Sequence, residues 1–237
     1  MEKIDWNSFW NNYRNIESGT ESDLFFQVGK TVNKAPISKA VFNNAFEDIV
    51  KSLSLQKEDV ILEMCCGNGL VTLPLSQIAK RIYAFDFTPH LIDAAVKFKQ
   101  NDAIEYSVGD AKASFFDLFM IEEMPNKFLM NDALGYFNPE DLQEIIKYIS
   151  TKAPKFSFYL TGIPNDALKW NFYNTEERKE DYLAGVASGD ESNNGMGRWW
   201  QKKELLEIAE TLGLKVTLKN QADTISNYRM DVLFEKE

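Results

Sequence analysis

An acidic residue followed by a glycine-rich turn is the strongest chemical signal in the chain. Glu63 lies in the apolar run VILEM, and Gly67 and Gly69 follow in CCGNGL, ahead of a stretch with helical character. Glycines let the backbone pass close to a ligand and take conformations that a side chain forbids. A nicotinamide fingerprint would have a third glycine where this chain has Thr72, and an acid at position 63 is poorly suited to a pyrophosphate. The turn therefore favours a cationic ligand over a dinucleotide.

Polar residues also follow the next apolar runs along the chain. Asp86 comes about twenty residues after the turn, where a carboxylate can accept hydrogen bonds from both hydroxyls of a ribose. Asp110 closes the following run, and Asn131 with Asp132 closes the one after it. Because parallel strands end at the same edge of a sheet, we expect these side chains to lie along one rim.

Short apolar runs alternate with amphipathic stretches, which is typical of a parallel sheet with helices on both faces. Strands are predicted at 60–64, 81–86, 104–110, 126–132 and 155–162, and helical segments at 70–80, 90–99, 112–120, 139–150 and 200–212. The runs 214–220 and 227–236 are joined by a short connection and predict a closing antiparallel pair. The predicted fold class is therefore α/β, a Rossmann-like doubly wound sheet of about seven strands, mostly parallel with an antiparallel last strand.

Two segments fall outside this alternation. Residues 1–55 contain an aromatic opening and a helix-like stretch, and we expect them to form an N-terminal helical cap. Residues 56–237 are then the ligand-binding domain. An insertion at about 163–198 within it is rich in Asn, Gly and charge, and we expect it to cover the binding edge as a lid.

Composition excludes several classes of protein. A length of 237 residues fits one domain, and 26 basic against 36 acidic residues give a net charge of −10, which disfavours a nucleic-acid partner. The chain has no long apolar run and no signal-like N-terminus, so we expect a cytoplasmic protein without a membrane partner. Cys65 and Cys66 are adjacent and His90 is the single histidine, a set that suits neither a disulfide framework nor a metal.

The acid-x-x-x-Gly-x-Gly pattern at Glu63, the acids after the next two strands and the order of elements resemble the class I S-adenosylmethionine-dependent methyltransferases. The resemblance implies that the chain binds S-adenosyl-L-methionine and releases S-adenosyl-L-homocysteine. For the methionine part of the cofactor it implies contacts from Glu63, Cys65, Gly67, Asn68 and Gly69. For the nucleoside it implies Asp86 at the ribose, Phe87, Asp110 and Ala111 at the adenine, and for the transfer site Asn131.

A narrower resemblance, to bacterial small-molecule methyltransferases of surface-polysaccharide (capsule) and natural-product pathways, rests on W-x-x-FW, QVGKTV, GRWW and YRMDVL. It implies methyl transfer to an oxygen of a small metabolite, with phosphorylated, phosphoramidate and sugar intermediates as candidates. The catalytic candidates are Asp132 and Tyr136, because the loop after the fourth strand offers no histidine base. The substrate-binding candidates are Tyr13, Gln27, Lys30, Arg198, Trp199 and Arg229, whose cations suit an acceptor that is already anionic. Of the rings of Trp199 and Trp200, we expect one in the core and one at the surface or cleft.

Three alternatives stay open. The first is an N-methyltransferase of a small amine or amino sugar, and the second is a cofactor-binding protein without turnover. The third is a nucleic-acid or protein methyltransferase, which is disfavoured by the negative charge and by NDALGY standing where an Asn-Pro-Pro-aromatic loop would be. The sequence leaves the oligomeric state open.

Overall fold

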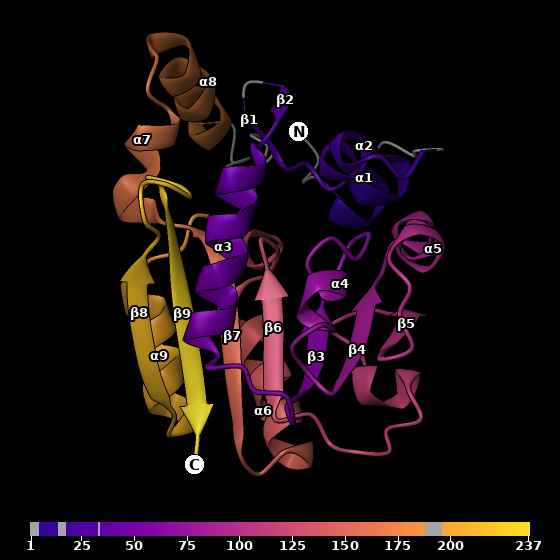
Figure 1. The fold of residues 1–237 in the computed structure, drawn as a ribbon. Coiled ribbons are helices and arrows are strands. Elements are labelled where there is room, and N and C mark those ends of the chain that lie inside the picture. The colour runs from indigo at the N-terminus through magenta and orange to yellow at the C-terminus, as the bar shows by residue number, and fades with distance from the viewer. Residues whose placement is uncertain (1–4, 14–17, 33, 188–195) are drawn as a thin grey trace.

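A seven-stranded sheet with the strand order β5-β4-β3-β6-β7-β9-β8 organises the chain (Figure 1). The structure is a computed structural model that describes residues 5–13, 18–32, 34–187 and 196–237. The strands are β3 (Val60–Met64), β4 (Arg81–Asp86), β5 (Ile104–Val108), β6 (Lys127–Asn131), β7 (Phe156–Pro164), β8 (Lys215–Asn220) and β9 (Arg229–Lys236). Pairings among β3 to β7 are parallel, and β9 pairs antiparallel with both β7 and β8. The predicted sheet, with its antiparallel closing pair, is confirmed.

Helices cover both faces of the sheet, because alternate strand residues point to opposite sides. Leu62 and Met64 face a core shared with α6 (Pro139–Lys152) and α9 (Lys202–Leu212). Ile61 and Ile82 face a second core shared with α3 (Lys39–Ser52), α4 (Thr72–Leu75) and α5 (Pro89–Phe98). The start of α6 is specified locally by Pro139 in its first turn and by a capping box between Asn138 and Asp141.

Two of the predicted helices are much shorter than expected. The segment 70–80 forms only α4, after which amide bonds such as Gln77 N to Pro74 O tighten the chain into turns. The segment 112–120 forms only the 3-10 helix η1 (Phe115–Leu118). Phe115, Phe116 and Phe119 are all buried there. Tertiary packing of these rings, and not helix propensity alone, sets the form of this segment.

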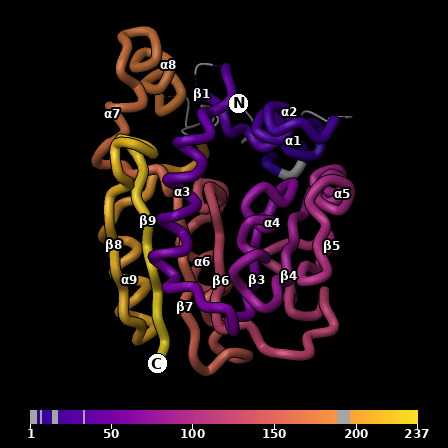
Figure 2. Tube along the Cα trace, viewed as in Figure 1, coloured from indigo at the N-terminus to yellow at the C-terminus, as the bar shows by residue number. Residues whose placement is uncertain are grey.

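The N-terminal segment and the insertion lie at the carboxyl ends of the parallel strands. The N-terminal segment contains α1 (Trp6–Asn12), α2 (Glu21–Gln27) and a small hairpin of β1 (Thr31–Val32) and β2 (Ala35–Pro36) that the sequence did not predict. In Figures 1 and 2, α1 and α2 lie beyond the ends of β3 and β4. The insertion contains η3 (Asp166–Leu168), α7 (Lys169–Phe172) and α8 (Glu176–Ala187), and its residues 188–195 fall outside the described part of the chain. The cap and lid boundaries stay predictions. Among the helices of the described residues, none combines the length and the apolar character that crossing a bilayer requires.

Candidate active site at the carboxyl edge of the sheet

The glycine turn joins the end of β3 to the end of β4. Gly67 has a φ of +55°, and a Cβ placed on it would lie 2.9 Å from Val28 Cγ1, so a side chain is excluded there. The Gly67 amide donates to Asp86 Oδ2 at 3.0 Å, and the Thr88 amide donates to Oδ1 at 2.9 Å. Asp86 therefore fixes the turn while its carboxylate oxygens still have lone pairs for a ligand.

Glu63 is buried beneath this turn at 1% exposure. The Thr72 hydroxyl donates to its Oε2 at 2.6 Å. Burial raises the pKa of Glu63 to about 7, the charge of Asp86 adds to the rise, and the Thr72 hydrogen bond and the more distant Lys30 oppose it. Burial likewise raises the pKa of Asp86, against the hydrogen bonds from Thr88 and Gly67. Within the described residues neither carboxylate forms a salt bridge, so both retain an affinity for a cation.

The remaining predicted cofactor residues continue along the same edge. Asp110 is exposed just after β5 and accepts a hydrogen bond from the Lys112 amide at 2.9 Å. Ala111 is buried next to it, and Phe87 and Asn131 are half-buried at the ends of β4 and β6. The Gly109 amide donates to Asp86 O at 3.0 Å and ties the ends of β4 and β5 together. The structure thus brings these predicted residues to one rim.

Two buried amide side chains near the turn are incompletely hydrogen-bonded. Asn68 Nδ2 donates to Leu24 O and to Gln27 Oε1, both at 2.9 Å. Asn68 Oδ1 and Gln27 Nε2 have no partner among the described residues. An unpaired buried polar atom costs about 1–3 kcal/mol, so a ligand that carries both donors and acceptors suits this position. S-adenosylmethionine has an amino-acid group of that kind and a positive sulfur, and the residues present fit it.

A second charged cluster lies at the ends of β6 and β9. Asp132 follows β6 in a left-handed conformation with a φ of 56°. Lys30 Nζ and Arg229 Nη1 each form a salt bridge with its carboxylate. Burial alone would raise the pKa of Asp132, but the charges of Lys30 and Arg229 outweigh burial and hold the pKa below its ordinary value. Two cations around one anion leave this cluster with a net positive charge.

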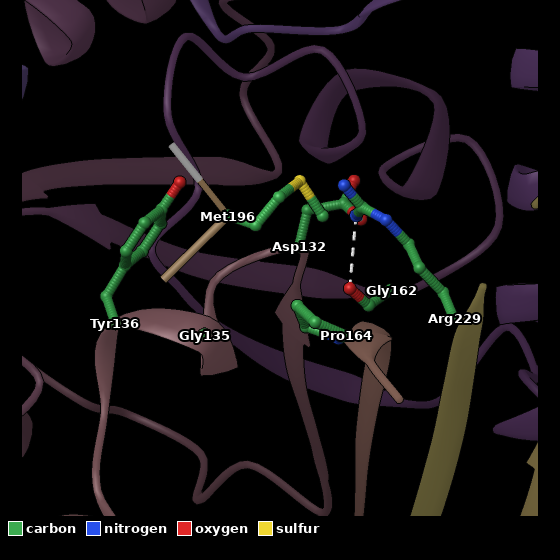
Figure 3. Close-up of a pocket in the computed structure, with 7 residues that line it drawn as sticks. All are labelled: Asp132, Gly135, Tyr136, Gly162, Pro164, Met196 and Arg229. Carbon is green, nitrogen blue, oxygen red and sulfur yellow. Dashed lines mark hydrogen bonds and ion pairs between the residues drawn. The ribbon is translucent and has the colours of Figure 1, made fainter. Parts of the chain in front are cut away.

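This cluster borders a small cavity of about 30 Å³ (Figure 3). Its lining includes Asp132, Tyr136, Pro164, Met196 and Arg229. A space of that size holds little more than one water-sized group. On the opposite side of Tyr136, Trp6 and Trp10 pack against the ring with centroid separations of 4.7 and 6.0 Å, so α1 covers this part of the edge.

The environment of the two predicted catalytic residues argues against a general base. Asp132 is neutralised by two cations and its pKa is lowered. Burial raises the pKa of Tyr136 to about 12, so its phenol stays protonated near neutral pH. A base needs a pKa close to the working pH and a free lone pair. Both residues lie at the carboxyl edge of the sheet, and this environment favours a positioning role over proton removal.

The other substrate-binding candidates are spread over the edge. Gln27 lies beside the glycine turn against Asn68. Tyr13 packs edge-to-face on Trp10, and its carbonyl oxygen contacts His90 Nε2 at 3.1 Å. Arg198 forms a salt bridge with Glu204, and with Trp199 it lines a separate cavity of about 470 Å³ below α8. Trp200 is fully buried in the core, whereas Trp199, at 8% exposure, lines this cavity, so one ring lies in the core and the other at a cleft, as expected. Trp199 packs in an aromatic cluster with Tyr173 and Tyr182, whereas Trp200 joins the main core.

Sequence reasoning missed two residues near Asp132. Gly162, in the run LTGIP, contacts both Asp132 and Arg229, and Asp231, in YRMDVL, is buried behind it. A glycine at the end of an otherwise apolar strand and an acid inside another are the signals that could have found them. No group of three or more His, Cys, Asp or Glu side chains within the described ranges is arranged to hold a metal ion.

Comparison with known proteins agrees with this geometry. Residues 61–152 match the family model "Methyltransferase domain". The 23S rRNA (uracil(1939)-C(5))-methyltransferase RlmD of Francisella tularensis subsp. novicida is 30% identical over 119 residues, which cover 50% of this chain and 24% of that protein. The chain thus spans about a quarter of the length of that relative.

Two solved structures share the fold. Magnesium protoporphyrin IX methyltransferase (ChlM) from Synechocystis PCC 6803, with bound SAM, superposes with a TM-score of 0.60 at 12% identity, covering 100% of both chains. DhpI in complex with SAM and HEP superposes with a TM-score of 0.59 at 14% identity, covering 96% of this chain and 94% of the other. The family match covers residues 61–152, and these likenesses show that the chain has the fold of S-adenosylmethionine-binding methyltransferases.

Proposed function

We propose that the protein transfers a methyl group from S-adenosylmethionine to an oxygen of a small, anionic metabolite in the cytoplasm. The observation that carries this proposal is the pair of buried carboxylates, Glu63 and Asp86, held at the glycine turn by neutral donors alone. Glu63 and the turn would hold the methionine part, Asp86 the ribose, and Asp110 with Ala111 the adenine. S-adenosylmethionine supplies an electrophilic methyl group when it is bound.

The chain's own residues then have three tasks, which are to bind, to orient and to exclude water. The aromatic residues of α1 cover the edge at Tyr136 and keep solvent from it. Lys30 and Arg229 hold the acceptor by its negative charge. An acceptor oxygen that is already anionic needs no base, which agrees with the lowered pKa of Asp132.

The positive charges of Lys30 and Arg229 favour some acceptor candidates over others. A phosphorylated or phosphoramidate intermediate suits the two cations, whereas a neutral sugar hydroxyl would need a base, a role for which Asp132 and Tyr136 are poorly suited. An ammonium acceptor for N-methylation would be repelled by the net positive cluster. Among pathways, surface-polysaccharide biosynthesis is the hypothesis to test first, because its intermediates combine sugars with phosphate groups.

Two experiments test the proposal in sequence. Calorimetric titration with S-adenosylmethionine should show saturable binding, and absence of binding at millimolar ligand would contradict a cofactor role. Incubation with isotope-labelled cofactor and fractionated cell extract, followed by mass spectrometry, should then give a labelled product of low mass whose unmethylated acceptor is an anion, because the transfer cancels one negative charge. Labelling only of products whose acceptors are neutral or cationic would overturn the acceptor class, and cofactor binding without any labelled product would favour the protein without turnover.

A second candidate is methylation of RNA, which the name of the RlmD relative favours. The match covers about a quarter of that protein, and the net charge of −10 opposes binding to a polyanion. Fluorescence anisotropy with a labelled RNA at 50 mM and 200 mM salt separates the two. Affinity that falls steeply with salt would support the RNA candidate over the small metabolite.

A further inference from the structure

A β-bulge interrupts the pairing of β7 with β9 beside the charged cluster. Leu160 pairs with Val232 and Ile163 pairs with Met230, and the register shifts between these two pairs. Two residues of β7, Thr161 and Gly162, therefore stand opposite the single residue Asp231 of β9. Bulges of this kind re-aim backbone and side-chain groups and are common next to active sites.

The carboxylate of Asp231 satisfies the polar groups of this bulge. Its Oδ1 accepts hydrogen bonds from the Gly162 amide at 2.9 Å, the Thr161 hydroxyl at 2.7 Å and Gln221 Nε2 at 2.9 Å. Its Oδ2 accepts from the Tyr159 hydroxyl at 3.0 Å. Asp231 is 1% exposed. A carboxylate this deeply buried is tolerated because all of these donors surround it.

The other end of Gly162 contacts the charged cluster. Its carbonyl oxygen accepts a hydrogen bond from Arg229 Nη1 at 3.0 Å, which Figure 3 marks. Gly162 has a φ of +74°, and a Cβ there would lie 1.8 Å from Asp132 Oδ1. The bulge thus does two things at once, since it orients a carbonyl that fixes Arg229 and it leaves room for the carboxylate that Arg229 binds.

We propose that Asp231 is a positioning residue for the acceptor site, because it holds the Thr161–Gly162 bulge and through it fixes Arg229 against Asp132. The inference rests on the proposed function, in which Arg229 binds an anionic acceptor. Without the Asp231 carboxylate the Gly162 amide is left unpaired in a buried place, and a bulge with an unpaired amide relaxes toward another backbone conformation. The Gly162 carbonyl then turns away and Arg229 loses its fixed direction.

The test compares three variants of the full-length protein. Asp231→Ala removes the acceptor of the Gly162 amide. Asp231→Asn keeps an oxygen in that position and is the conservative rescue. Tyr159→Phe is the matched control, since it removes a hydroxyl shared between this carboxylate and that of Asp48 without touching Gly162. If Asp231→Ala does not fold, Asp231→Ser replaces it, because a serine hydroxyl is too short to reach that amide.

Two readouts follow the Arg229 side chain. The first is the ¹⁵N NMR signal of its guanidinium group. The chain has five arginines, so few such signals need to be assigned. The second is the affinity for inorganic phosphate, the probe for an anionic acceptor, measured in the presence of S-adenosylhomocysteine. We expect Asp231→Ala to average the two Nη signals and to weaken phosphate binding by about tenfold, the loss of one charged hydrogen bond. Asp231→Asn and Tyr159→Phe should keep separate Nη signals and stay within about threefold of the wild-type affinity.

The outcomes distinguish a failure of the positioning role of Asp231 from a failure of the proposed function. Fixed Nη signals and unchanged phosphate affinity in Asp231→Ala would overturn the positioning role, as would an equal loss in Tyr159→Phe. Absence of S-adenosylhomocysteine binding to the wild-type protein would instead overturn the proposed function. In that case the NMR signals would still show whether Asp231 fixes Arg229.

Discussion

The carboxylates at the two ends of the carboxyl edge of the sheet lie in opposite electrostatic surroundings. At the cofactor end, Glu63 and Asp86 are buried among neutral hydroxyl and amide donors, and burial raises the pKa of both. At the acceptor end, Asp132 lies between Lys30 and Arg229, and their charges lower its pKa. Among the described residues, no cation forms a salt bridge with Glu63 or Asp86, whereas two cations surround the single carboxylate of Asp132. The contrast shows which sign of ligand each end is suited to bind.

The largest expected effect is a change in the free energy of unfolding with pH, caused by the raised pKa of Glu63. Its pKa is raised from the ordinary 4.5 to about 7, so between these pH values the folded protein binds a proton that the unfolded chain has released. The free energy of unfolding should therefore fall as pH rises through this window, by about 3 kcal/mol. Urea unfolding at several pH values between 4.5 and 7.5 measures the fall, and Glu63→Gln should remove this contribution. If the free energies of unfolding of the wild-type protein and of Glu63→Gln changed with pH in parallel, the pKa of Glu63 would be the same in the folded and the unfolded protein. That result would contradict the expected rise.

Replacement of Asp86 tests the cofactor end directly. Asp86→Ala should weaken S-adenosylhomocysteine binding by roughly 1.5–3 kcal/mol, the value of hydrogen bonds to a charged group. The variant also releases the amides of Gly67 and Thr88 from their acceptor. Calorimetry gives the dissociation constant, with Asp102→Ala, an exposed acid away from the turn, as the control. An unchanged affinity would contradict the ribose assignment.

The acceptor end is tested by removing its negative charge. Asp132→Asn should strengthen binding of inorganic phosphate by about 1 kcal/mol, or roughly fivefold, because the two cations lose their internal counterion. Titration in the presence of S-adenosylhomocysteine measures the change. Asp166→Asn, which removes a similar ion pair with Lys169, is the control and should have no effect. Weaker phosphate binding in Asp132→Asn would mean that the carboxylate helps to build the anion site.

The smallest expected effect concerns the hydrogen bond from Thr72 to Glu63 and its influence on the pKa of Glu63. Thr72→Val removes the hydroxyl that donates to Glu63 Oε2 and so opposes the raised pKa. The affinity for S-adenosylmethionine should rise with pH as Glu63 ionises, and in this variant the midpoint should move upward by roughly 0.5–1 in pH. Titrations from pH 6 to 8.5 locate the midpoint. A midpoint that stays in place would show that the Thr72 hydrogen bond does not affect the pKa of Glu63.

The cofactor end was predictable because its signals are local. The apolar run before Glu63, the glycines after it and the spacing to Asp86 specify a strand, a turn and a second strand end without any long-range contact. The same local rules failed at 112–120, where three phenylalanines pack into one core and a short 3-10 helix replaces the predicted helix.

The acceptor end was only partly predictable because its contacts join distant segments. Lys30 and Arg229 could be named as cations, but their convergence on Asp132 depends on the sheet order and on the bulge at Gly162. No periodicity places a strand bulge, and no spacing relates residue 30 to residue 229. The lowered pKa of Asp132 could not be predicted for the same reason, since a carboxylate's pKa is set by neighbours that the sequence does not place.

We expect a cationic sulfur nucleoside to bind along the rim formed by the ends of β3, β4 and β5. A crystal structure with S-adenosylmethionine or S-adenosylhomocysteine would locate it. The ribose hydroxyls should lie within hydrogen-bond distance of the Asp86 carboxylate, and the amino-acid group should lie beside the turn at Gly67. Ligand density elsewhere, or a rim that stays empty at saturating ligand, would contradict it.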